Sequence, residues 1–310
     1  MHDDIPAAKR LKPGHYTLIK QEADPSIKIE DPILFKQDSD HASPTSENVG
    51  QIPASLGAPG LGSGSTATVH AVDESAVVKR FSSANERIQR ELLVYVRLGH
   101  HENIARLLFC TTTCLVIERG VCLRDLLELR EKEAYHYTRE NLDWALQAAN
   151  GLQHIHSRGV VHADVGPQNL ILVDSKHVKW VDFEGSGIDY DIANSCYEPY
   201  YSLPSGDMPS IQTDIFAFGC LLYELEQGKS PVSQILDHWS IFPQPKAFET
   251  SFSLCCLPDI DWFFLGSLIS DCWMPRYQNM DPVVEALQRF STDSKASDMH
   301  PRIVPKPAPS

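Results

Sequence analysis

Three polar side chains stand close together in the second half of the sequence, at a spacing that suits chemistry on phosphate groups. Asp164 follows His162 by two residues, and Asn169 comes five residues after Asp164. Asp182 then follows the apolar run 178–181. A carboxylate such as Asp164 can orient a hydroxyl group and accept its proton, and oxygen donors such as those of Asn169 and Asp182 are the ligands that Mg²⁺ prefers. The pattern therefore indicates transfer of a phosphoryl group to a hydroxyl.

A glycine-rich stretch far upstream could hold the phosphates themselves. Gly62, Ser63 and Gly64 lie between two short runs of strand type. Glycine lets backbone N–H groups approach phosphate oxygens without a Cβ in the way. Lys79 ends the next apolar run, where its ammonium group could contact the α- and β-phosphates. Taken singly, a Gly-Ser run is usually a loop and a lone lysine is usually a surface residue. The interpretation therefore depends on the order of these motifs along the chain.

The overall composition excludes some classes of function. The net charge of −14 argues against general binding of nucleic acid, which needs a basic surface. The eight cysteines are scattered without the paired spacing of a zinc site, and we expect them to be reduced thiols inside the cell. The longest apolar run, 215–225, is about half of what a membrane span needs. We therefore expect a soluble protein without a membrane partner.

The chain divides into a central region and two polar ends. Residues 1–50 and 293–310 lack a sustained apolar period, and we expect both to be disordered. The basic cluster 9–12 resembles a nuclear import signal, so we expect the protein in the nucleus, the cytoplasm or both. Lys20 and Lys28 each stand in an apolar-Lys-x-Glu pattern that resembles SUMO acceptor sites.

The central region predicts an α+β fold of two lobes. Residues 51–119 should form a small β-rich lobe with one helix at 86–98, because short apolar runs alternate with turn residues. Residues 120–292 should form a larger helical lobe. Its expected helices are 142–156, 215–226, 263–273 and 282–290. A cleft between two lobes is a common place for a ligand.

Residues 56–292 resemble the eukaryotic protein kinase domain, within an expected domain of 51–292. The signatures His-Ala-Asp at 162–164 and Asp-Phe-Glu-Gly-Ser at 182–186 are similar to those of a divergent group typical of fungi. The apolar stretch 213–220 resembles a buried kinase helix, on which Asp214 is expected to cap the backbone of the catalytic loop. The resemblance also suggests that Arg276 pairs with Glu198.

The resemblance implies a set of roles for residues of both lobes. Glu91 would pair with Lys79 and fix its position, with Glu86 as the alternative partner. Asp164 would be the catalytic carboxylate. The implied cofactors are ATP and Mg²⁺ (or Mn²⁺), the metal being held by Asn169 and Asp182. The residues implied to contact ATP are Gly62, Ser63, Gly64, Val69, Val77, Lys79, Ile117, Glu118 and Gly120.

Three departures from the kinase pattern surround these residues. Ala163 stands where the family has an arginine that reads a phosphorylated activation loop, which predicts that this chain lacks such a switch. Gly166 stands where a lysine neutralises the γ-phosphate, and losing such a contact lowers a rate by about 10²–10³ in other enzymes. Glu184 adds a carboxylate in place of glycine.

Three functions fit these residues. The leading one is a protein kinase, by resemblance of serine/threonine type, that phosphorylates a protein substrate. The second is a pseudokinase that binds nucleotide or partners without efficient catalysis, which the loss of the lysine at Gly166 favours. The third is a small-molecule phosphotransferase similar to aminoglycoside or choline kinases, which often carry an acidic residue after the metal-binding aspartate, as Glu184 does.

Overall fold

The computed structural model describes most of the central region and parts of the ends. The described residues are 33–34, 60–63, 67–82, 86–132, 137–189, 191–194, 197–198, 201–202, 208–231, 260–274 and 276–296. The basic cluster 9–12 and the patterns around Lys20 and Lys28 lie outside them. The described chain separates into two units, one of residues up to Leu92 together with Arg106–Arg119, and one of Leu93–Ala105 together with the residues from Gly120 on.

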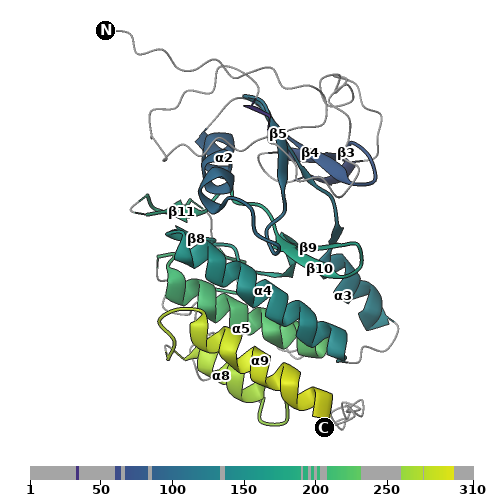
Figure 1. Cartoon of the computed structure of the whole chain (residues 1–310), viewed down its shortest axis with the longest axis vertical. Helices are drawn as coiled ribbons and strands as arrows, with labels where there is room; N and C mark the ends of the chain where they lie inside the picture. Colours follow the sequence, from purple (N-terminus) through teal and green to yellow (C-terminus); the bar gives the residue numbers. More distant parts are fainter. Residues whose placement is uncertain are drawn as a thin grey trace, which may run out of the picture. The chain divides into compact units, whose positions relative to one another are not determined.

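The first unit contains an antiparallel sheet, and Figure 1 labels three of its strands, β3, β4 and β5. The strand order is β1-β5-β6-β4-β3-β2. Its strands are β1 (Ile33–Leu34), β2 (Gly60–Ser63), β3 (Ala67–Ala71), β4 (Ala76–Phe81), β5 (Leu107–Cys110) and β6 (Cys114–Glu118). One face of the central strands is an apolar cluster of Ala76, Val78, Phe109, Cys114 and Val116. Alternation along a strand then turns the neighbouring residues of β4, among them Lys79, to the opposite face.

Two features of this unit bear on the sequence predictions. Helix α2 (Glu86–Leu98) has the predicted bounds, and it buries Ile88 and Leu92 one turn apart on the same side. Strand β1 was not predicted, since it lies in a polar segment expected to be disordered. Its two residues pair with the edge of β5, Ile33 opposite Cys110 and Leu34 opposite Phe109.

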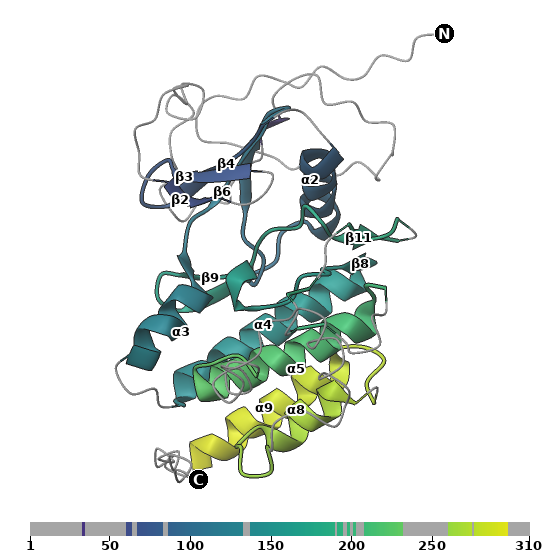
Figure 2. The same ribbon diagram turned by 180° about the vertical axis from the view of Figure 1, so that it is seen from behind.

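The second unit is built mainly on helices (Figure 2). They are α3 (Leu123–Lys132), α4 (Arg139–Ser157), α5 (Ile211–Gln227), α8 (Gly266–Trp273) and α9 (Asp281–Ala296). Helix α4 packs against α5 and α9, and α5 also packs against α8. Almost every residue of α5 is buried, as its apolar sequence predicts, and Ser210 caps its first turn by accepting from the Thr213 N–H at 3.2 Å.

Short strands in the second unit carry the loops of interest. Strands β10 (His177–Trp180), β9 (Leu170–Val173) and β7 (Val121–Cys122) form one antiparallel sheet, and β8 (Val160–Val161) pairs with β11 (Gly187–Ile188). The 3₁₀ turn η1 (Pro167–Asn169) leads directly into β9. The loop from His162 to Asn169 is therefore held between β8 and β9, and Asp182 to Ser186 lie between β10 and β11.

A sheet-rich first part and a helical second part confirm the predicted α+β fold. Helix α8 begins three residues later than predicted, because Phe263 lies in a turn whose N–H donates to the Ile260 carbonyl. Helix α9 reaches Ala296, past the predicted end of the domain at 292. Among the described residues, no helix combines the length and the apolar character that crossing a membrane requires.

Candidate active site

The first unit holds a buried ion pair at the predicted phosphate-positioning lysine. Lys79 Nζ lies 2.8 Å from Glu91 Oε2, and the two residues are 7% and 0% exposed. Glu86, the alternative partner, is exposed at the start of α2. The predicted pairing of Lys79 with Glu91 is thus confirmed. Removing either partner would take an opposite charge away from a buried group, which is costly.

The strand register brings the other predicted ATP contacts of this unit onto one sheet face. Val69 lies opposite Lys79, and Val77 lies opposite Ile117. Directly paired residues share a face, and so do residues two apart on one strand, so these four side chains line the face that carries Lys79. Gly62 lies opposite Val69 on the next strand, after a bulge. Ser63 ends β2, and Gly64 lies outside the described residues.

Glu118 ends β6 with its side chain and its amide both engaged inside the first unit. Its carboxylate accepts from Arg106 Nη2 and from the Arg106 N–H, both at 3.2 Å. Its own N–H donates to the Arg106 carbonyl at 2.9 Å. A hydrogen bond from an adenine base to Glu118 would therefore have to use the carbonyl oxygen.

Gly120 has a packing role in the second unit, besides the ATP contact implied for it. A Cβ at this position would lie 2.8 Å from the Leu172 carbonyl oxygen and 2.9 Å from the Ile171 Cβ. Only glycine allows the backbone to pass this close to β9. The glycine is therefore explained by packing alone, and its presence does not by itself indicate a ligand.

Asp214 on α5 anchors the start of the predicted catalytic loop, residues 162–169. Its carboxylate accepts from the His162 N–H at 2.8 Å and from the Ala163 N–H at 3.0 Å, which confirms the predicted capping. It also accepts from His156 Nε2 at 2.9 Å and from the Tyr197 hydroxyl at 2.7 Å. Ala163 has a φ of 66°, in the left-handed region that residues other than glycine seldom adopt. The two backbone bonds to Asp214 stabilise this conformation just before Asp164.

Asp164 is oriented through both of its carboxylate oxygens. Asn169 Nδ2 donates to Asp164 Oδ2 and to the Asp164 carbonyl, both at 2.8 Å. Gln168 Nε2 donates to Asp164 Oδ1 at 3.3 Å. The structure thus brings the predicted catalytic carboxylate and the predicted metal ligand Asn169 into direct contact, because η1 turns the chain back onto the loop.

Burial is the largest influence on the charge of Asp164. It raises the pKa of the carboxyl to about 6, and the nearby charges of Asp182 and Glu198 act in the same direction. The hydrogen bonds from Asn169 and Gln168 lower the pKa, but not enough to offset the burial. A carboxylate with a pKa near neutrality is a better proton acceptor than an exposed aspartate, and it is still ionised above pH 7.

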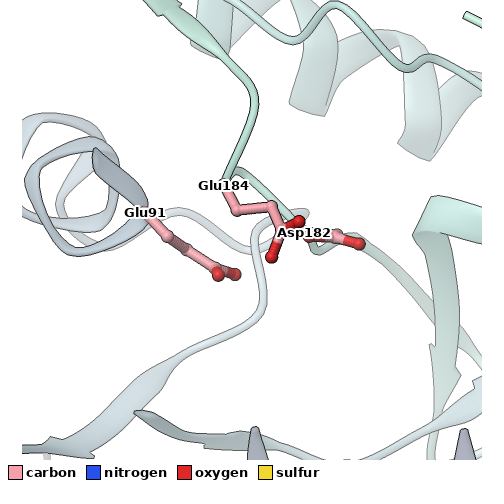
Figure 3. Close-up of side chains that lie close together, drawn as sticks. All are labelled: Glu91, Asp182 and Glu184. Atoms are coloured by element: carbon pink, nitrogen blue, oxygen red, sulfur yellow. The ribbon is translucent and has the colours of Figure 1, made fainter. Parts of the chain in front are cut away.

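Asp182 and Glu184 form a pair of carboxylates on the segment that follows β10 (Figure 3). One oxygen of each lies within 4.8 Å of the other. Asn169 uses its Nδ2 on Asp164, which makes its Oδ1 the atom that could bind a cation. Carboxylate and amide oxygens are hard donors, so this set of residues fits Mg²⁺ or Mn²⁺. Glu184, which the sequence showed as an added carboxylate in place of glycine, lies beside Asp182.

Aromatic packing fixes the segment around Phe183. Its ring is fully buried and lies 5.1 Å from the Tyr95 ring and 5.2 Å from the His162 ring, centroid to centroid. Burial lowers the pKa of His162, which keeps its imidazole neutral near pH 7. Its Nε2 lies 3.2 Å from the Val181 carbonyl, so the proton is on this nitrogen. The residues on either side of Asp182 are therefore tied to the catalytic loop within one unit.

The suggested pairing of Arg276 with Glu198 is wrong. Arg276 Nη1 instead binds Asp271 Oδ1, five residues before it. Glu198 accepts from Arg124 through two bonds, Nη1 to Oε1 at 2.6 Å and Nη2 to Oε2 at 2.8 Å. The pairing of Arg124 with Glu198 was missed because the two residues lie far apart along the chain. The only sequence signal for it is a cation in the first turn of a helix next to the catalytic loop.

Comparison with known proteins agrees with this geometry. The family described as "Protein kinase domain" matches this chain over residues 58–261. The serine/threonine-protein kinase RUNKEL of Arabidopsis thaliana is 30% identical over 195 residues, which is 55% of this chain and 14% of that protein. The 3-phosphoinositide-dependent protein kinase 1 of the same plant is 28% identical over 218 residues, or 60% of this chain and 42% of that protein. The chain thus spans less than half the length of either relative, and neither comparison bears on the predicted fungal group.

Proposed function

Because the chain belongs to the protein kinase domain family, we propose that it is an ATP-dependent serine/threonine kinase that transfers the γ-phosphate of ATP to a protein hydroxyl. The names of its relatives support this class of acceptor over a small molecule. The observation that carries the proposal is the fixed orientation of Asp164, whose two oxygens accept from Asn169 and Gln168. Phosphoryl transfer depends mainly on such positioning, since little covalent chemistry falls to the protein.

Most of the proposed ATP contacts fall on residues of the first unit. Lys79, fixed by Glu91, would contact the α- and β-phosphates, and the backbone around Gly62 would approach them closely. Val69, Val77 and Ile117 would contact the adenine ring from the sheet face they share with Lys79. The contacts proposed for Ser63, Gly64, Glu118 and Gly120 are those of the backbone.

Asn169 and Asp182 would hold Mg²⁺ or Mn²⁺, with Glu184 as an additional carboxylate. A bound divalent cation neutralises negative charge on the phosphates. Asp164 would orient the hydroxyl of the substrate and take its proton as the hydroxyl oxygen bonds to the γ-phosphorus. The bond from that phosphorus to the bridging oxygen breaks, and ADP leaves.

Transfer of labelled phosphate tests the proposal directly. The full chain is incubated with γ-³²P-ATP and Mg²⁺, and label is followed on the chain itself and on a mixed peptide library, with identification of the acceptor residue. We expect label on serine or threonine, and a fall of about 10²–10⁴ in the rate for Asp164→Asn, as for loss of a general base. Asp143→Asn is the matched control, because Asp143 is exposed on α4. Equal rates for wild type and Asp164→Asn would contradict the proposal.

A pseudokinase is the second candidate, and Gly166 is the observation that favours it. Position 166 carries no side chain that could supply positive charge beside Asp164. Thermal unfolding with ATP and Mg²⁺ separates the two candidates, because a ligand that binds only the folded state raises the melting temperature. A metal-dependent rise without any transfer of label would assign the chain to the pseudokinases.

A further inference from the structure

The side-chain amide of Gln168 occupies the space beside Gly166. A Cβ built on Gly166 would lie 2.3 Å from Gln168 Oε1 and 2.7 Å from Gln168 Nε2. The backbone at Gly166 is extended, with a φ of 175°, so the conformation itself does not require glycine. The absence of a side chain at 166 therefore has a local reason, which is that it leaves room for the amide of Gln168.

The amide of Gln168 is held at both ends by charged groups. Arg124 Nη2 donates to Gln168 Oε1 at 2.8 Å, and Gln168 Nε2 donates to Asp164 Oδ1 at 3.3 Å. A guanidinium only donates and a carboxylate only accepts, so the amide can satisfy both partners in one orientation only. Arg124 thus determines which end of the amide faces Asp164.

Arg124 is itself fixed by a paired contact with Glu198. Two parallel bonds, of 2.6 and 2.8 Å, join the guanidinium to the carboxylate. Such a bidentate pair restricts the plane of the guanidinium as well as its position. Burial alone would lower the pKa of Arg124, but the bond to Glu198 holds it above the ordinary value, so the cation persists at any working pH. Glu198, Arg124, Gln168 and Asp164 therefore form one continuous chain of contacts within the second unit.

We infer that Gln168, oriented by Arg124, is a positioning residue for Asp164, and that it takes the place of a side chain at position 166. The inference rests on the proposed kinase function, since it assigns Gln168 a part in orienting the catalytic carboxylate. Asn169 fixes one oxygen of that carboxylate and Gln168 fixes the other, so the plane of the carboxylate is set from two sides. Orientation of this kind affects the reacting state more than the binding of ATP.

Gly166→Ala is the sharpest test, because it displaces the Gln168 amide without altering Gln168 or Asp164. The added methyl group meets only the end of a flexible side chain, so the fold should survive. We expect Gly166→Ala and Gln168→Ala each to lower kcat about tenfold, as loss of one hydrogen bond to a charged group does. KM for ATP should stay within about twofold, since the ATP contacts are untouched. Melting temperatures confirm that each variant is folded.

The double variant decides whether the two changes act through the same contact. If Gly166→Ala acts by displacing Gln168, the double variant should be no slower than Gln168→Ala alone. Multiplied effects, an unchanged kcat in Gly166→Ala, or a loss confined to KM would overturn the inference. Gln153→Ala is the matched control, because Gln153 Nε2 also donates to an aspartate, Asp281, at an exposed site on α4. Its kcat should equal that of the wild type.

A measurement without turnover separates this inference from the proposed function. The side-chain amide signals of Gln168 are assigned in a ¹⁵N NMR spectrum by their loss in Gln168→Ala. Both Gly166→Ala and Arg124→Ala should shift them strongly, and Gln153→Ala should not. Unshifted signals would overturn the placement of the amide. If the wild type transfers no phosphate but the signals shift as expected, the proposed function fails while the chain of contacts stands.

Discussion

Two aspartates of the second unit, the fully buried Asp214 and the partly buried Asp164, differ in how many donors face them. Asp214 on α5 accepts from four groups, namely His156 Nε2, the N–H groups of His162 and Ala163, and the Tyr197 hydroxyl. The side chain of Asp164 in the catalytic loop accepts from two, Asn169 Nδ2 at 2.8 Å and Gln168 Nε2 at 3.3 Å. The two residues lie near each other in the fold and share the same chemistry, so their surroundings alone make the difference.

The two carboxyls consequently have opposite pKa shifts. Burial is the largest influence on both and by itself raises the pKa. At Asp214 the bond from His156 and the other donors outweigh burial and hold the pKa below its ordinary value. At Asp164 burial prevails, and the pKa rises to about 6. A buried carboxylate surrounded by donors serves as an anchor, whereas one with few donors keeps the capacity to take a proton.

The largest expected effect comes from removing the charge of the anchor. Asp214→Asn should lower the free energy of unfolding by about 3–5 kcal/mol, because an amide nitrogen would face groups that already donate. Urea denaturation measures this change. Asp143→Asn on α4 is the control and should cost less than about 1 kcal/mol, since its ion pair with Arg139 is exposed. A similar small cost for both variants would show that Asp214 is no anchor.

The second prediction concerns the stability of Asp164→Asn as a function of pH. Folding raises the pKa of Asp164 from an ordinary value of 3.8 to about 6, so the folded state binds more protons within this window. The wild type therefore loses stability as pH rises from about 4 to 6, by on the order of 1–3 kcal/mol, and the variant lacks this loss.

Urea unfolding of both proteins at pH 4.5, 6 and 7.5 checks this sign. The free energy of unfolding of Asp164→Asn, relative to wild type, should rise with pH up to about 6 and then level off, since Asp164 is ionised in both states above its folded pKa. A difference that stays constant over this range would mean that Asp164 is not perturbed by burial.

The smallest expected effect tests the contribution of a single donor to the anchor. Tyr197→Phe removes the hydroxyl that donates to Asp214 Oδ1 at 2.7 Å and leaves the ring in place. The free energy of unfolding should fall by about 1–2 kcal/mol, as for one buried hydrogen bond to a charged group. Tyr277→Phe is the control, because its hydroxyl bonds Asp271 away from Asp214. A loss as large as that of Asp214→Asn would show that the hydroxyl contributes far more than this one hydrogen bond, since it also contacts Thr213 Oγ1 at 2.7 Å.

The sequence predicted those features that depend on local pattern. Helix α2 has the predicted bounds because its apolar residues recur at helical spacing, and the burial of α5 follows from an apolar sequence on all sides. The pairing of Lys79 with Glu91 and the capping by Asp214 followed from the order of the motifs. In these cases the interaction depends on the backbone positions of the two residues, and the motif already determines those positions.

The sequence did not predict which side chains pair when side-chain packing decides the pairing. Glu198 pairs with Arg124, on a distant helix, and not with the Arg276 that the motif order suggested. At position 166 the sequence shows only a missing lysine, whereas the structure also shows the amide of Gln168 in that space. Such contacts depend on side-chain conformations, and no spacing rule specifies them.

Titration of carboxyl groups in the folded protein tests the contrast between the two aspartates most directly. The protein is labelled with ¹³C-aspartate and kept free of divalent metal, and the two signals are assigned with Asp164→Asn and Asp214→Asn. The carboxyl carbon of Asp164 should titrate with a midpoint near 6, and that of Asp214 should remain ionised below the ordinary value of 3.8. A common midpoint for both signals would contradict the assignment of one aspartate to anchoring and the other to proton transfer.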